Sequence, residues 1–182
     1  MNDLASLQVA PWGNFYVIVG SSAAALIGIQ FVVIALVANM RTLATADSIR
    51  AFGTPTVVHL GEALVVSALM SAPWASFSRA SIALAACGLG GLGYAVMTIH
   101  RACRQTDYKP VWEDWCWYAL LPCSAYAALA VAAILLSTTT RAALFVIGAA
   151  ALGLLLIAIH NAWDAVTHVV AAGPHGDATK RE

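Results

Sequence analysis

The segment at residues 142–168 is the strongest constraint on the fold, because its first 18 residues are all apolar or glycine. A helix that crosses a bilayer needs about 20 predominantly apolar residues. Four earlier segments pass the same test, at residues 15–40, 56–72, 80–99 and 115–136. Only 10% of the chain is charged, against about 25% in a soluble domain. The sequence therefore predicts an all-α, polytopic membrane protein with five transmembrane helices in one domain, residues 1–170, and a short polar tail, residues 171–182.

Breaker residues set the expected start of the second helix. Gly53, Thr54 and Pro55 precede residue 56, and both glycine and proline interrupt helices. We therefore expect the second transmembrane helix to begin after Pro55. A separate short helix on the membrane surface is predicted at residues 44–52.

The distribution of Lys and Arg predicts the orientation, because cytoplasmic loops carry an excess of these residues. Arg79 and Arg141 lie on the side of the two short connections. The other seven basic residues lie with the long connections and the C-terminus: Arg41, Arg50, Arg101, Arg104, Lys109, Lys180 and Arg181. We expect the N-terminus outside and the C-terminus in the cytoplasm, in an inner membrane of the bacterial type. The first helix is expected to insert without cleavage.

Small residues mark the expected helix contacts within the bilayer. They let helix backbones approach closely, which matters in lipid because apolar burial no longer drives association. They recur at four-residue spacing in the first helix and cluster in the third, at Gly20, Ala24, Gly28, Gly88 and Gly91. We expect these faces to pack within the chain or to form a homo-oligomer in the lipid bilayer. Pro122 predicts a kink in the fourth helix.

Titratable residues gather at the expected cytoplasmic end of the helices. His59 and Glu62 lie three residues apart on the second helix. His160 and Asp164 lie four apart on the fifth, so each pair shares a helix face. A carboxylate in the hydrocarbon needs a partner or water. Further candidate ligands or supporting groups lie at the same level: His100, His168, Glu113 and Asp114.

Three functions are compatible with a cluster of His59, Glu62, His160 and Asp164. Lining a watery entrance, these residues would bind a cation or proton in a small channel or transporter. As ligands and general base for zinc, iron or manganese, they would form a membrane-embedded metalloenzyme acting on a membrane-soluble substrate. As a structural network, they would suit an accessory or regulatory subunit of a membrane protein partner. The channel or transporter is our leading interpretation, and no catalytic residue is assigned.

Other classes find little support in the sequence. Nine basic and nine acidic residues without a basic patch disfavour nucleic-acid binding. The chain lacks the HExxH and GxSxG motifs of zinc peptidases and serine hydrolases. Haem is disfavoured because His59, His100 and His160 all lie near one interface and no c-type attachment motif is present. The four cysteines form no CxxC pair and are expected to be reduced thiols.

Overall fold

The computed structural model describes residues 10–39, 46–74, 76–104 and 112–171, which are almost entirely helical and contain no strand. The helices are η1 (Ala10–Trp12), α2 (Gly13–Asn39), α3 (Ala46–Ser71), α4 (Phe77–Arg104), α5 (Trp112–Trp115), η2 (Cys116–Leu120), α6 (Leu121–Leu135) and α7 (Thr140–Ala171). Within these ranges, five helical segments are long and apolar enough to cross a membrane. These properties indicate an integral membrane protein, and they confirm the prediction of five transmembrane-length helices.

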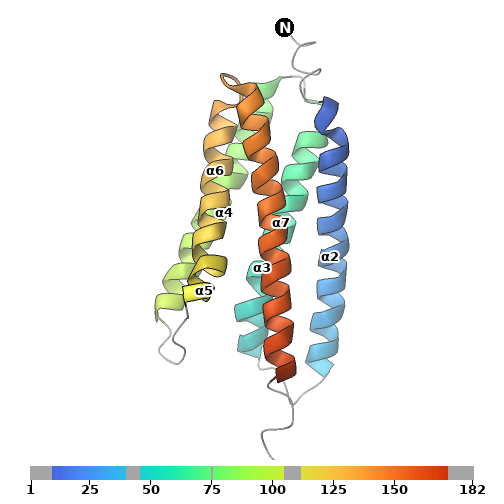
Figure 1. Cartoon of the computed structure of the whole chain (residues 1–182), viewed down its shortest axis with the longest axis vertical. Helices are drawn as coiled ribbons and strands as arrows, with labels where there is room; N and C mark the ends of the chain where they lie inside the picture. Colours follow the sequence, from blue (N-terminus) through green and yellow to red (C-terminus); the bar gives the residue numbers. More distant parts are fainter. Residues whose placement is uncertain (1–9, 40–45, 75, 105–111, 172–182) are drawn as a thin grey trace, which may run out of the picture.

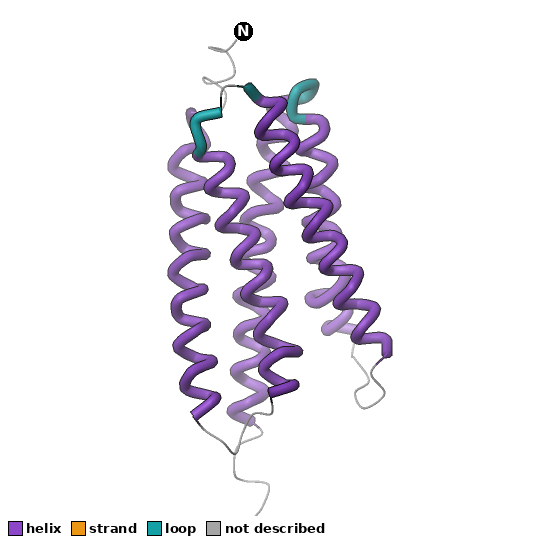
Figure 2. The backbone as a smooth tube through the Cα atoms, turned by 180° about the vertical axis from the view of Figure 1, so that it is seen from behind, coloured by secondary structure: helices purple, strands orange, loops and turns teal. Residues whose placement is uncertain are grey.

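The five long segments run alternately up and down in one bundle (Figure 1). Helix α2 begins at one end of the bundle, and the turns after α3 and α6 lie at the same end. We call this the short-loop end. The helix α7 finishes at the opposite end, which we call the basic end because α4 finishes there at Arg101 and Arg104. Helix α4 packs mainly on α6, and α2 packs on α3, while α7 contacts both α3 and α6. Seen from behind, the α4/α6 pair leans away from the other helices toward the basic end (Figure 2).

Helix α3 is longer than the breaker residues predicted, although its candidate membrane span, Thr54–Ser71, is close to the expected 56–72. A single helix, α3, runs from Ala46 to Ser71 with Pro55 inside it, where we expected a separate helix at 44–52 and a new start at residue 56. Proline removes one backbone donor. Continuing the helix keeps the remaining backbone groups paired, and lipid offers them no alternative partner. Helices α4 and α7 also extend beyond their predicted bounds at both ends, and α7 reaches Ala171.

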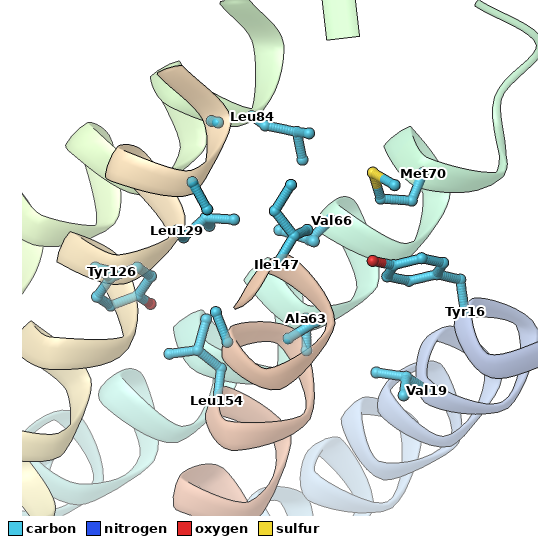
Figure 3. Packing of buried hydrophobic residues seen from close by; sticks show 14 of the residues in the cluster. Tyr16, Val19, Ala63, Val66, Met70, Leu84, Tyr126, Leu129, Ile147 and Leu154 are labelled. Carbon is cyan, nitrogen blue, oxygen red and sulfur yellow. The ribbon is translucent and has the colours of Figure 1, made fainter. Parts of the chain in front are cut away.

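A dry apolar core fills the half of the bundle toward the short-loop end. Val66, Leu84, Leu129 and Ile147 are fully buried and come from four different helices. Figure 3 shows Ile147 of α7 between Val66 on one side and Leu129 on the other. Within the described residues, this half of the bundle is therefore closed by packed side chains.

Glycines set the close approach of α4 to α6. A methyl group at Gly88 would come within 2.6 Å of the Ala130 backbone nitrogen, and one at Gly91 would collide with the Tyr126 ring. Ser81 of α4 also donates a hydrogen bond to the carbonyl of Ala133 on α6. These two glycines therefore pack within the chain.

The small residues of α2 do not all share one contact. A methyl group at Gly20 would come within 3.0 Å of Ser67 Cβ on α3. Ala24 and Gly28, on the same predicted stripe, are exposed. Only the first member of that stripe therefore lies in the α2/α3 contact.

Candidate functional site

The four residues predicted to form one cluster lie in two different places. His59 is buried between α3, α4 and α6, with 2% of its surface exposed. Glu62 lies one turn further along α3 and is half-buried. His160 and Asp164 instead line a cleft between α7 and the α5–η2 segment. Each pair shares a helix face, but the two faces meet different neighbours.

The buried histidine is held by tyrosines from two other helices. His59 Nδ1 and Tyr126 Oη share a hydrogen bond of 2.8 Å, whose direction follows the imidazole tautomer. The Tyr94 ring of α4 stands edge-on to the imidazole, with ring centroids 6.4 Å apart. We call His59, Glu62, Cys87, Tyr94 and Tyr126 the interior polar group. This group connects α3 to the α4/α6 pair. Few other contacts join α3 to α4.

Local sequence explains how Tyr126 reaches His59. Gly91 on α4 leaves the space that the Tyr126 ring fills, because any side chain there would overlap the ring. The ring is fully buried, and its hydroxyl group ends against the imidazole. A glycine in α4 thus positions a histidine partner on α6.

Several buried polar atoms in the described residues have no hydrogen-bond partner. The Glu62 carboxylate is within hydrogen-bonding reach of the Cys87 thiol on α4, yet its Oε1 atom is buried and unpartnered. Asn161 of α7 is fully buried, and both its amide nitrogen and oxygen are unpartnered. Buried polar atoms are normally satisfied by protein or ordered water. Two separate interior positions, at Glu62 on α3 and Asn161 on α7, therefore hold buried polar atoms without a protein partner.

The second place is an aromatic and acidic cleft of about 320 Å³ at the basic end. We call it the α5/α7 cleft. The Tyr118 hydroxyl donates a hydrogen bond of 3.1 Å to Asp164 Oδ2. The rings of Trp117 and His160 stack with centroids 3.7 Å apart and planes 16° from parallel. The full lining is Glu113, Trp117, Tyr118, His160, Trp163, Asp164 and Thr167.

A π-helical turn places two of the aromatic residues in this lining. Residues Cys116–Leu120 form a π-helix, and the Leu121 N–H donates to the Cys116 carbonyl five residues earlier. Trp117 and Tyr118 both stand in this turn. Pro122, the predicted kink, is buried just after it, in the first turn of α6. Single π-turns are rare and occur frequently at functional sites, so the cleft coincides with an unusual backbone feature.

The remaining predicted residues are spread around the basic end. Glu113 lines the α5/α7 cleft. His100, in the last part of α4, is exposed and does not line the cleft. The side chains of Asp114 and His168 lie outside the described residues. Among the side chains that the structure describes, no three His, Cys, Asp or Glu residues come together as a group able to hold a metal ion.

Sequence reasoning missed the aromatic partners and the buried amide. Trp117, Tyr94, Tyr118 and Tyr126 were not among the residues that the sequence predicted for the site. A signal for Trp117 and Tyr118 was present, since they precede Pro122 within one turn or so and a proline perturbs the helix before it. Asn161, directly after His160, is a strongly polar residue that follows an apolar run. The same pattern identified His160 as a candidate.

Comparisons with protein-family models, with curated proteins and with solved structures find no match for this chain.

Proposed function

We propose that this chain is a small transporter-like or channel-like protein of a bacterial-type inner membrane that binds a cation or proton at its cytoplasm-facing end. The observation that carries the proposal is the α5/α7 cleft. Two carboxylates, Glu113 and Asp164, line it together with His160, and among the side chains that the structure describes no Lys or Arg does. Such a lining favours positive charge. The cleft sits at one end of a transmembrane bundle, where a solute enters or leaves.

The interior polar group gives the same proposal a second step. His59 and Glu62 lie nearer the centre of the bundle, and Glu62 Oε1 and Asn161 carry unused hydrogen-bonding capacity. Intramembrane histidines and carboxylates are typical of ion and proton pathways. The short-loop half has a closed apolar core within one chain. We therefore place the rest of the route at a contact between copies in a homo-oligomer, or in a conformation in which that core opens.

A flux assay tests the transport function. The purified full-length protein is reconstituted into liposomes, and proton, K⁺ and choline uptake are followed under an imposed gradient. Asp164→Asn removes a charge of the cleft and should reduce the flux. His100→Ala is the matched control for His160→Ala, because His100 lies at the same end but outside the cleft. Wild-type protein that folds and carries no flux, or equal losses in the two histidine variants, would contradict the proposal.

Cysteine labelling tests the proposed orientation. Cys103 is exposed at the basic end of α4, which the Lys/Arg distribution assigns to the cytoplasm. A membrane-impermeant maleimide should label Cys103 in inside-out vesicles and leave it unlabelled in right-side-out vesicles. A Thr138→Cys variant in a Cys103→Ser background should show the reverse pattern. Labelling of Cys103 from the outer side would mean that the chain is inverted.

The packed apolar core favours one other candidate, a non-transporting accessory subunit of a membrane protein partner. Fully buried Val66, Leu84, Leu129 and Ile147 pack across the short-loop half of the part of the chain that the structure describes. In that case wild type would show only background flux, and Asp164→Asn would not change it. Binding of the partner would instead respond to substitutions at exposed positions such as Gly28. The metalloenzyme alternative has no grouped set of ligands among the described side chains to support it.

A further inference from the structure

The lining of the α5/α7 cleft combines aromatic rings with carboxylates. Trp117, Tyr118 and Trp163 supply the rings, and Glu113 and Asp164 supply negative charge. His160, the basic side chain in the lining, is stacked on Trp117. From this combination we infer that the cleft binds an organic ammonium group. This inference states which class of ligand the cleft binds. It rests on the proposed function only because both take this cleft as the cation site.

Cation–π attraction is the physical reason for preferring an organic ammonium to an inorganic ion. An ammonium group over the face of a Trp or Tyr ring is attracted by the negative face of the ring, and methyl groups on nitrogen add apolar contact. A hard metal ion instead needs about six to eight oxygen ligands. Asp164 already accepts the Tyr118 hydroxyl through Oδ2. Two carboxylates beside three aromatic rings therefore match an ammonium group better than a bare ion.

The size and depth of the cleft agree with such a ligand. Its volume of about 320 Å³ lies at the small end of the range for small-molecule pockets, about 300–1,000 Å³. One water occupies about 30 Å³ in the liquid, so the cleft is too large for a single ion or water molecule. Trp163 stands within four residues of the end of the membrane-spanning part of α7 and is 70% exposed. Both a soluble amine and the amine of a lipid headgroup can reach this level.

The π-turn gives independent support. An ordinary α-helical turn would present Trp117 and Tyr118 about 100° apart around the axis. The π-turn at Cys116–Leu120 widens the helix here, and both rings line the same cleft. The stack on His160 and the hydrogen bond to Asp164 hold these two side chains against α7. The aromatic part of the site is thus already assembled without a ligand.

Choline binding to the full-length protein tests the inference. Isothermal titration calorimetry in phosphatidylglycerol nanodiscs should show saturable choline binding that K⁺ at equal ionic strength does not displace. Trp163→Ala and Asp164→Asn should each weaken it about tenfold, since either the ring or the charge is lost. Trp112→Ala is the matched control, because Trp112 is 76% exposed next to the cleft but does not line it. Circular dichroism and gel filtration confirm that each variant is folded.

A second lipid composition identifies the source of the ammonium group. If choline binding disappears in nanodiscs that contain phosphatidylethanolamine, the lipid headgroup occupies the site, and if binding persists, the ligand is a soluble amine. Both results support the inference. It is overturned if folded wild-type protein binds no choline in phosphatidylglycerol, if K⁺ displaces choline fully, or if Trp112→Ala weakens binding as much as Trp163→Ala. Choline binding without any flux would end the transport proposal alone, whereas flux without choline binding would end the ammonium assignment alone.

Discussion

His59 lies near the middle of α3 and His160 lies toward the basic end of α7, and their surroundings differ in almost every respect. His59 is 2% exposed and shares a hydrogen bond with Tyr126 in the helix interior. His160 is partly exposed and stacks flat on Trp117 at the edge of a cleft. The first arrangement joins three helices, whereas the second leaves open space beside the ring. Residue type is therefore a poor guide to the role of these two histidines. The side chains on the neighbouring helices decide it.

This contrast separates stability from binding. The interior polar group is enclosed by packed helices, so changes there should act mainly on folding. The α5/α7 cleft is bordered by partly exposed side chains, so changes there should act mainly on ligands.

The largest effect is expected at the glycine that admits Tyr126 to the interior. Gly91→Leu puts a side chain where the Tyr126 ring lies, and overpacking of this kind destabilises by about 1–3 kcal/mol or more. Thermal unfolding in detergent should show a clear fall in Tm. Gly90→Leu is the control, because no atom outside its own helix lies within 4 Å of a methyl group at that position. Equal losses in the two variants would show that the loss does not come from the Tyr126 contact.

A smaller effect is expected from the hydrogen bond itself. Tyr126→Phe keeps the ring and removes the hydroxyl that pairs with His59. A lost interhelical hydrogen bond in a membrane protein costs about 0.6–1.7 kcal/mol. Denaturant unfolding in mixed micelles should detect this loss. In the double variant with His59→Leu the two losses should be less than additive, and strict additivity would mean that the pair is not coupled in solution.

The smallest change in stability is expected in the cleft. Tyr118→Phe removes the partly buried hydrogen bond to Asp164, and we expect the free energy of unfolding to change by no more than about 0.5 kcal/mol. Choline affinity and cation flux should nevertheless fall, because the Asp164 carboxylate loses the group that orients it. A stability loss as large as that of Tyr126→Phe, with unchanged binding, would assign the cleft a structural role and remove the contrast between the two regions.

The sequence was informative about segments and less so about their ends. Five apolar runs predicted five membrane-length helices, and the structure shows five. The start of α3 differed because Pro55 is accommodated inside the helix. A breaker residue acts on local propensity, but continuation of the helix keeps backbone groups paired in lipid, and that requirement is stronger.

The site was predictable only in part, for a related reason. Depth along a helix follows from residue number, so Glu113, His160 and Asp164 were expected at the same end, and all three line the α5/α7 cleft. Rotation about the helix axis does not follow from residue number. It depends on which helices touch, and the contact between Gly91 and Tyr126 turns the interior face of α6 toward His59.

By itself, the amino-acid sequence predicted five membrane-length helices, which the described residues contain, because hydropathy acts along the chain. Only the tertiary structure decided that His59 pairs with Tyr126, and that the π-turn before Pro122 carries Trp117 to His160 and Tyr118 to Asp164. Those outcomes depend on packing between helices that are far apart in sequence. Steric fit at a few small residues, which no single segment encodes, selects among the possible arrangements.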